Sequence, residues 1–286
     1  MSAGYLDRLA ERSAATGTVL CLGIDPDPAA LPVGFGPDVA GIERFARLLL
    51  DAAGPHAAAV KVNVAFFEAF GSAGIAALER IRGAVPPGLP LILDAKRGDI
   101  GSTAARQATA LFDALGADAI TVNPYLGGEA IEPLVGRADC FAYVLCRTSN
   151  PGAGELQDLV VAGAADTPAE PLFLRVARRV RGWATEETVG LVVGATAAAE
   201  MALVRAVAPD LPFLVPGVGA QGGDADAVLV HGPATEGESA NRAGGGLLVN
   251  VSRGIAGAAR EGSPADLGER LASIAREWAG RLPVLG

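Results

Sequence analysis

The chain has 286 residues, half of them hydrophobic and 5% aromatic, with a formal net charge of −9. This length supports one large core or two modest ones, and the negative charge argues against a general affinity for nucleic acid or anionic membranes. No secretory segment is recognisable, and no apolar stretch reaches the ~20 residues of a membrane helix. We therefore expect a cytoplasmic protein that does not bind membranes.

The cysteines and histidines give no sign of a metal site. Cys21, Cys140 and Cys146 are odd in number and lack the spacing of a zinc site. Cys21 and Cys146 lie inside apolar runs, which predicts buried thiols. His56 and His231 have no obvious partners, so a histidine-centred triad or a histidine-rich metal site is not expected.

Apolar runs alternate with helically spaced segments along the whole chain. In the first third of the chain, we expect a helix over 5–15, a strand over 18–24, a helix over 38–53, a strand over 57–63, a helix over 65–83 and a strand over 91–93. A helix over 103–115, a strand over 119–122, a short helix over 128–135, a strand over 141–146, a helix over 168–182 and a strand over 190–194 are expected next. The last part should contain a helix over 197–207, a strand over 212–215, a Gly-rich loop over 222–246 with one helical turn, a strand over 247–251 and a helix over 264–279.

This alternation predicts an α/β fold. Strands that are nearly continuous apolar runs are typical of parallel strands buried on both faces, and eight βα units in about 250 residues match a (β/α)8 TIM barrel. The competing architecture is an open doubly wound sheet, but no Gly-x-Gly-x-x-Gly follows the first strand. No linker divides the chain, so we expect a single domain over residues 1–286.

The third strand ends in charges with a fixed spacing. Asp94 and Lys96 are two residues apart, so they point the same way on a strand, and Asp99 follows after Gly98. Charges at the end of an apolar strand are costly to bury unless they hold one another. The spacing therefore indicates a functional site, although a solvated charged loop would show the same pattern.

Polar residues follow the other strands at the corresponding positions. In barrels of this kind the active site lies at the carboxyl ends of the strands, so these residues are expected to converge. They are Asp25, Lys61, Asn63, Asp94, Lys96, Asp99, Thr121, Asn123, Arg147, Thr148, Ser149, Asn150, Gly217, Gly219, Gln221, Ser252 and Arg253.

The last two strands are followed by a candidate phosphate site. The glycine-rich segment 216–223 can present backbone N–H groups to an anion, and Arg253 can add a guanidinium. The loops after strands seven and eight are a frequent phosphate location in such barrels.

Several of these segments resemble one family. Residues 93–103, Leu-Asp-Ala-Lys-Arg-Gly-Asp-Ile-Gly-Ser-Thr, resemble the signature of orotidine 5′-phosphate decarboxylases. Segments 22–26, 61–63, 148–153, 216–223 and 250–255 are also similar to that family, and the chain most resembles its longer bacterial branch. The resemblance covers almost the whole chain, with the loop 222–246 matching least well.

The resemblance implies an activity and a set of residues. The family decarboxylates orotidine 5′-monophosphate to uridine 5′-monophosphate in the last step of de novo pyrimidine synthesis, with no metal and no organic cofactor. The implied catalytic residues are Lys61, Asp94, Lys96, as the proton donor to C6, and Asp99. The implied substrate-binding residues are Asp25, Lys61, Asn63, Ile100, Thr103, Asn123, Ser149, Pro216, Gln221, Gly222, Ser252 and Arg253.

The resemblance also implies a homodimer in which Asp99 and Thr103 reach the active site of the neighbouring subunit. Three alternatives stay open. One is a magnesium-dependent sugar-phosphate decarboxylase or synthase of the same superfamily. Another is a Schiff-base aldolase that uses Lys61 or Lys96, which is disfavoured because flanking acids favour the charged lysine. The third is a barrel that binds a phosphorylated ligand without catalysis.

Overall fold

The structure, a computed structural model, describes residues 4–163, 168–183, 187–219, 222–260 and 263–285. Within these residues, eight parallel strands form a closed barrel in the order β1-β10-β9-β8-β5-β4-β3-β2, so that the last strand pairs with the first. The barrel strands are β1 (Leu20–Ile24), β2 (Ala59–Asn63), β3 (Leu91–Arg97), β4 (Ala119–Val122), β5 (Phe141–Arg147), β8 (Val189–Val193), β9 (Phe213–Pro216) and β10 (Leu248–Val251). The (β/α)8 prediction is confirmed.

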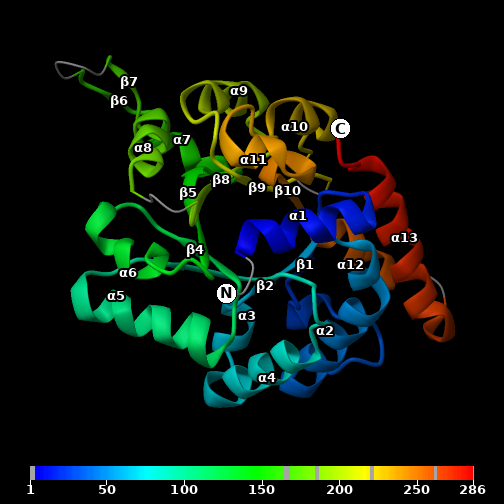
Figure 1. The fold of residues 1–286 in the computed structure, drawn as a ribbon. Coiled ribbons are helices and arrows are strands. Elements are labelled where there is room, and N and C mark those ends of the chain that lie inside the picture. Colours follow the sequence, from blue (N-terminus) through cyan, green and yellow to red (C-terminus); the bar gives the residue numbers. More distant parts are fainter. Residues whose placement is uncertain (1–3, 164–167, 184–186, 220–221, 261–262, 286) are drawn as a thin grey trace.

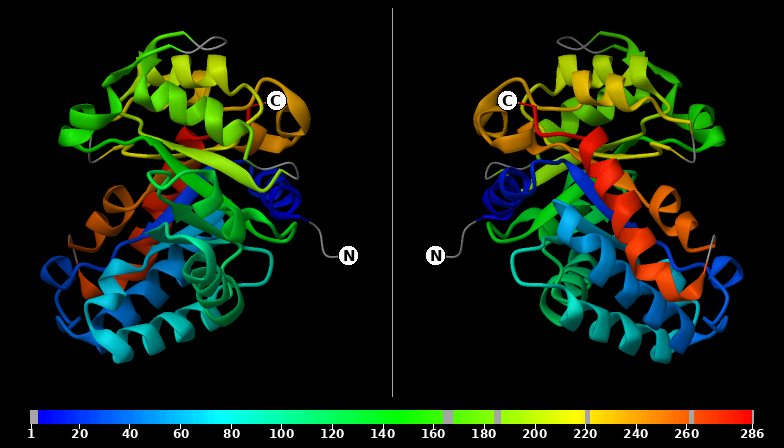
Figure 2. Two further views of the ribbon diagram at one scale, coloured as in Figure 1. Left: turned by 90° about the vertical axis from the view of Figure 1, so that its left-hand side faces the viewer. Right: turned by 90° about the vertical axis from the view of Figure 1, so that its right-hand side faces the viewer.

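Helices surround the barrel on its outside (Figures 1 and 2). The α-helices are α1 (Tyr5–Thr16), α2 (Val39–Ala53), α3 (Ala65–Glu68), α4 (Gly71–Ala84), α5 (Gly101–Ala108), α6 (Glu132–Val135), α7 (Gly154–Gln157), α8 (Leu172–Arg181), α9 (Ala198–Val207), α10 (Ala225–His231), α11 (Gly237–Asn241), α12 (Arg253–Ala256) and α13 (Leu267–Arg281). The remaining turns are a π-helix, η3 (Thr109–Ala114), and the 3-10 helices η1 (Pro28–Ala30), η2 (Gly54–His56), η4 (Gly128–Ala130), η5 (Pro151–Ala153), η6 (Ala243–Gly246), η7 (Gly257–Arg260) and η8 (Pro264–Asp266).

Some predicted elements differ from the observed ones. The helix expected over 168–182 begins only at Leu172, because the residues before it form β7 (Glu170–Pro171), which pairs antiparallel with β6 (Val160–Val161). This hairpin projects from the barrel at the upper left of Figure 1. The loop expected over 222–246 with one helical turn contains α10, α11 and η6. The helix expected over 65–83 is two helices, α3 and α4.

The end of the barrel at which the strands begin, here called the floor, is closed by α1. Tyr5, Leu6 and Leu9 of α1 belong to one buried cluster with residues from inside the barrel, and α1 lies in front of the strands in Figure 1. Among the described residues, no helix is long and apolar enough to cross a membrane.

Inside the barrel, side chains change from apolar to polar along the strands. Because successive strand residues alternate between the two faces, every second residue points inward. On four strands the inward residue near the floor is apolar and the next one is polar: Ala59 then Lys61, Ile92 then Asp94, Ala119 then Thr121, and Leu248 then Asn250. The polar residues therefore converge at the carboxyl ends of the strands, here called the mouth.

Candidate active site

Four side chains of alternating charge lie in a row across the mouth. Lys61 Nζ lies 3.9 Å from Asp25 Oδ1 and donates to Asp94 Oδ2 at 2.8 Å. Lys96 Nζ then donates to Asp94 Oδ1 at 2.6 Å. This contact confirms that Asp94 and Lys96 point to the same side, as their spacing predicts. Asp25 directly follows β1, Lys61 lies on β2, and Asp94 and Lys96 lie on β3.

The protonation states of the inner pair are fixed by its partners. Burial by itself would lower the pKa of Lys61, but the carboxylates of Asp94 and Asp25 outweigh it and hold the pKa above its ordinary value. Burial would likewise raise the pKa of Asp94, but Lys61 and Lys96 hold it well below its ordinary range. Both groups are therefore charged at neutral pH.

Lys61 and Lys96 are the only lysines in the sequence, which contains 21 arginines. The other side-chain ion pairs among the described residues use arginine, but a guanidinium does not release a proton at neutral pH. The Lys61 side chain is 5% exposed and the Lys96 side chain 51% exposed. Lys96 therefore presents an ammonium to the open part of the mouth, while Lys61 is enclosed.

Two cavities meet at this row, and Lys61, Asp94 and Pro216 line both of them. The first has a volume of about 150 Å³ and lies between the loops that follow β9 and β10. Its walls are Asp25, Lys61, Asn63, Asp94, Pro216, Gly217, Val218, Asn250, Ser252, Arg253 and Gly254. The two segments predicted to bind phosphate thus face the same space.

The glycine-rich loop folds back on itself beside this first cavity. Gly217 and Gly219 have φ values of 99° and 83°, which favour glycine, and Gly223 N donates to Gly217 O at 3.1 Å. A Cβ atom at Gly223 would lie 2.7 Å from that same oxygen. The glycines therefore allow a tight turn at the end of β9 that a larger residue would disrupt.

The second cavity has a volume of about 400 Å³ and a largely apolar wall. Leu145, Val192 and Leu214 form that wall, and Thr148, Ser149 and Asn150 lie on its rim. Gln157 of α7 holds the rim in place, because its side chain accepts from Thr148 N at 2.9 Å and donates to Thr148 Oγ1 at 2.8 Å.

Some predicted site residues lie elsewhere. Asn123 is exposed, its Oδ1 accepts from Tyr125 N at 3.0 Å, and it lines neither of the two cavities of the described chain. Asp99, Ile100 and Thr103 are also absent from these walls. Gly222, with φ of 77°, lies within the turn and lines neither cavity. Gln221 lies outside the described residues.

Thr121, which the sequence places among the polar residues at the strand ends but not in the implied binding set, lies in the wall of the larger cavity. Two further wall residues, Gln157 and Asn250, are not predicted from the sequence. The strand alternation could have found Asn250, which lies two residues before Ser252 on a predicted strand. Gln157 carries no such signal, because it lies in a short helix after the expected loop. Within the described part of the chain, Asn250 Oδ1 and Asp25 Oδ1 are buried without a hydrogen-bond partner.

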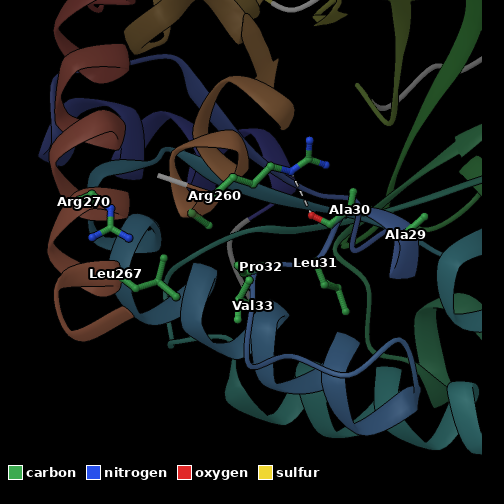
Figure 3. Close-up of a pocket in the computed structure, with 9 residues that line it drawn as sticks. Ala29, Ala30, Leu31, Pro32, Val33, Arg260, Leu267 and Arg270 are labelled. Atoms are coloured by element: carbon green, nitrogen blue, oxygen red, sulfur yellow. Dashed lines mark hydrogen bonds between the residues drawn. The ribbon is translucent and has the colours of Figure 1, made fainter. Parts of the chain in front are cut away.

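Other cavities extend from the mouth toward η1. A space of about 490 Å³ reaches from Asp25 and Arg253 to Arg260. Beyond it, a pocket of about 260 Å³ lies between the loop after β1 and the start of α13 (Figure 3). The guanidinium groups of Arg260 and Arg270 lie apart in this view, and both donate to backbone carbonyls, including Ala30 O at 3.2 Å and Ser263 O at 2.6 Å. These arginines thus hold backbone segments together.

In the described residues, no group of three or more His, Cys, Asp or Glu side chains gathers in a way that could hold a metal ion. The carboxylates of Asp25 and Asp94 both lie near the Lys61 ammonium, which is between them.

Comparison with known proteins gives consistent matches over almost the whole chain. A sequence profile described as the orotidine 5′-phosphate decarboxylase / HUMPS family matches residues 18–266. The orotidine 5′-phosphate decarboxylase of Thermomicrobium roseum is 46% identical over 279 residues, covering 97% of this chain and 93% of the relative. The solved structure of Leishmania donovani OMP decarboxylase has a TM-score of 0.80 at 39% identity, covering 97% of this chain and 96% of that one. A putative orotidine-monophosphate-decarboxylase from Toxoplasma gondii has a TM-score of 0.84 at 35% identity, with 97% and 94% covered.

Proposed function

Because the chain belongs to the orotidine 5′-phosphate decarboxylase / HUMPS family of enzymes, we propose that it decarboxylates orotidine 5′-monophosphate to uridine 5′-monophosphate and CO₂, the last step of de novo pyrimidine synthesis. The observation that carries the proposal is the row of Asp25, Lys61, Asp94 and Lys96 at the junction of two cavities. The smaller, polar cavity suits the phosphate and ribose, and the larger, apolar one suits the pyrimidine ring.

Lys96 is the proton donor in this proposal. When the bond from C6 to the carboxylate breaks, its electron pair stays on C6, which has no adjacent electron sink. The Lys96 ammonium stabilises this developing negative charge and then transfers a proton to C6, after which the lysine regains a proton from solvent. Its contact with Asp94 and its partial exposure support this role.

Asp94 remains ionised beside the carboxylate that leaves, because its pKa is held well below its ordinary range. It orients Lys96 and disfavours a second negative charge close to it. Binding energy from the phosphate, which takes no part in the chemistry, offsets the cost of placing these charges together. The polar and charged side chains that line the first cavity are consistent with these proposed contacts to the phosphate and ribose.

The other residues take the following roles in the proposal. Asp25, Lys61 and Asn63 bind the ribose, and Ser149 donates a hydrogen bond to the ring. The phosphate is bound by the loops after β9 and β10, through Pro216, Gln221, Gly222, Ser252 and Arg253. Asn123, although exposed in this chain, is proposed to contribute from the edge of the mouth.

A homodimer completes each site in this proposal. Asp99, Ile100 and Thr103 do not line the cavities of their own subunit, which supports a role in the site of a neighbour. Ile100 is an exposed apolar residue, as are Tyr125 and Leu126 on the loop after β4. The loop after β3, which carries Ile100, touches the loop after β4, since a Cβ atom at Gly98 would lie 2.8 Å from Asn123 O. Such a patch next to the mouth is suited to contact with a second copy.

Hybrid dimers test the shared site. Asp99→Ala and Lys96→Ala proteins are each expected to be inactive, but mixing them should restore activity through hybrids that carry one intact site. The matched control is a mixture of Asp94→Ala and Lys96→Ala proteins, which has no intact site in any combination. If subunit exchange is demonstrated and the first mixture stays as inactive as the control, the shared site is wrong.

Turnover of orotidine 5′-monophosphate, followed by loss of the orotate absorbance with and without a chelator, tests the activity. Turnover that survives the chelator supports the proposal. Loss of activity with the chelator would favour a magnesium-dependent relative, and trapping of a lysine adduct by borohydride would favour a Schiff-base aldolase. Binding of the nucleotide without turnover would favour a barrel that only binds its ligand.

A further inference from the structure

The hydroxyl of Thr121 joins the backbone of the proposed proton donor to its carboxylate partner. Thr121 lies at the end of β4 and is 2% exposed. Its Oγ1 accepts a hydrogen bond from Lys96 N at 3.0 Å and lies 2.8 Å from Asp94 Oδ1. A backbone amide can only donate, and an ionised carboxylate can only accept. The single hydroxyl proton is therefore directed at Asp94.

The bond to Lys96 N replaces a missing bond of the sheet. β3 and β4 pair regularly at Leu93 and Ile120, but the next pair joins Arg97 to Val122, so β3 carries a bulge between these positions. Within the bulge Lys96 has a φ of 46°, which is uncommon for a residue with a side chain. A conformation of this kind persists only where its surroundings hold it, and the Thr121 hydroxyl is such a support.

The bond to Asp94 completes the set of donors around that carboxylate. Lys61 Nζ donates to Oδ2, whereas Lys96 Nζ and Thr121 Oγ1 both donate to Oδ1. The two donors on Oδ1 come from different strands, so they oppose rotation of the carboxylate. Because the Lys96 ammonium lies 2.6 Å from this oxygen, a carboxylate that cannot rotate also fixes the ammonium.

The apolar residues that form the wall of the larger cavity cannot replace the hydroxyl. The neighbours of Thr121 on the larger cavity include Leu145, Val192 and Leu214, which have no polar side-chain atoms. A valine at position 121 would have nearly the same shape as threonine and would suit this wall. It would leave Lys96 N without its acceptor and Asp94 with one donor fewer.

We propose that Thr121 is a positioning residue for the reaction: it holds the bulge of β3 and the Asp94 carboxylate so that the Lys96 ammonium is aimed at the reacting carbon. This inference rests on the proposed decarboxylation. It concerns the chemical step and not the binding of substrate, since the hydroxyl is already engaged by two groups of the protein. Hence kcat should fall while KM changes little.

The test compares Thr121→Val and Thr121→Ser with a matched control at the floor, Thr18→Val. Thr18 is also fully buried, and its Oγ1 donates to Leu282 O at 2.6 Å and accepts from Leu20 N at 3.1 Å. Each valine variant loses a buried hydroxyl that donates one hydrogen bond and accepts another from a backbone N–H, so both should lower the melting temperature. Only Thr121→Val should lower kcat, by roughly 10- to 100-fold, because it loses a bond to a charged group.

Thr121→Ser keeps the hydroxyl and should restore most of kcat. The inference is overturned if Thr121→Val keeps the kcat of the unmodified protein, if it changes KM alone, or if Thr121→Ser is as slow as Thr121→Val. Should Thr121→Val not fold, Thr121→Cys, with a weaker donor, should give a lowered kcat, and an unchanged kcat would overturn the inference. Failure of the unmodified protein to convert orotidine 5′-monophosphate would instead count against the proposed function.

Discussion

The two ends of the barrel are built from the same strands, but their buried polar groups differ in charge and in hydrogen bonding. At the floor, Tyr5, Phe141 and Tyr143 pack with ring centroids 4.8–6.2 Å apart, and the Tyr5 and Tyr143 hydroxyls lie 3.1 Å from each other. At the mouth, Lys61 and Asp94 are charged, and buried acceptors such as Asn250 Oδ1 have no partner among the described residues.

This difference indicates what each end contributes. Burial raises the pKa of Tyr5 and of Tyr143, so the floor holds neutral groups that bond each other. An acceptor buried without a hydrogen-bond partner costs free energy. Among the described residues the mouth retains two such atoms in one cavity, Asp25 Oδ1 and Asn250 Oδ1. The floor thus stabilises the fold, whereas the mouth keeps polar atoms available for a ligand. Substitutions at the two ends should therefore separate stability from activity.

The largest expected effect is the loss of turnover in Lys96→Ala, by at least about 10⁴-fold, because both the charge and the transferable proton disappear. Lys96→Arg should be nearly as slow, since arginine keeps the charge but does not release a proton at neutral pH. Both variants should still bind nucleotide, which calorimetry can measure. The free energy of unfolding should change little, because the Lys96 side chain is half exposed.

Arg276→Ala, which removes an exposed cation from α13, is the control and should keep full activity. Turnover in Lys96→Arg close to that of the unmodified protein would show that charge alone is sufficient and that Lys96 is not the proton donor.

At the floor the effect should fall on stability. Phe141→Ala removes a fully buried ring from the cluster with Tyr5 and Tyr143, and we expect a loss of about 3–5 kcal/mol in the free energy of unfolding. Guanidinium chloride denaturation measures this loss, while kcat of the folded protein should stay the same. A fall in kcat without a matching loss of stability would contradict the separation of the two ends.

The same contrast explains what the sequence could predict. The eight strands are recognisable because each is an apolar run that parallel strands bury on both faces, and residues such as Lys61 and Asp94 follow from alternation and strand order. The β6–β7 hairpin and the helices α10 and α11 are short, so they lack the periodicity that identifies longer elements. Within the bulge Lys96 N donates to Thr121 of another strand, so no local pattern near Lys96 reveals this arrangement.

A smaller effect is expected from Gln157→Ala at the rim of the mouth. Loss of both bonds to Thr148 would free the segment that carries Ser149. Each such neutral hydrogen bond contributes about 0.5–1.5 kcal/mol, so kcat/KM should fall roughly tenfold. Steady-state kinetics measures this change. Gln157→Glu keeps the acceptor for Thr148 N, so its kcat/KM should lie between those of the unmodified protein and Gln157→Ala. Equal kcat/KM in all three proteins would exclude a role for Gln157 in holding the rim.

The last effect concerns the buried thiols at alkaline pH, of which Cys21 belongs to the floor cluster. Burial raises the pKa of Cys21 to about 12, with Lys61 lowering it and Asp25 and Asp94 raising it further. Burial also raises the pKa of Cys140 and of Cys146 to about 12. In the unfolded chain these thiols ionise near pH ~8.5, so above that pH the folded protein keeps protons that the unfolded chain releases.

The free energy of unfolding should therefore decrease as the pH rises from about 8.5 toward 12, by about 1.4 kcal/mol per pH unit for each thiol. Below that range the thiols are protonated in both states and contribute no slope. Cys21→Ala should remove one of the three contributions, and Cys146→Ala, which alters a thiol between the barrel and its helices, should remove an equal one. Denaturation at pH 8, 8.5 and 9 with a reducing agent measures these slopes below pH ~10, where Tyr5 and Tyr143 would titrate in the unfolded chain. A slope that Cys21→Ala leaves unchanged would mean that the thiol ionises within the folded barrel, close to Lys61, and that the charge of the mouth reaches the floor.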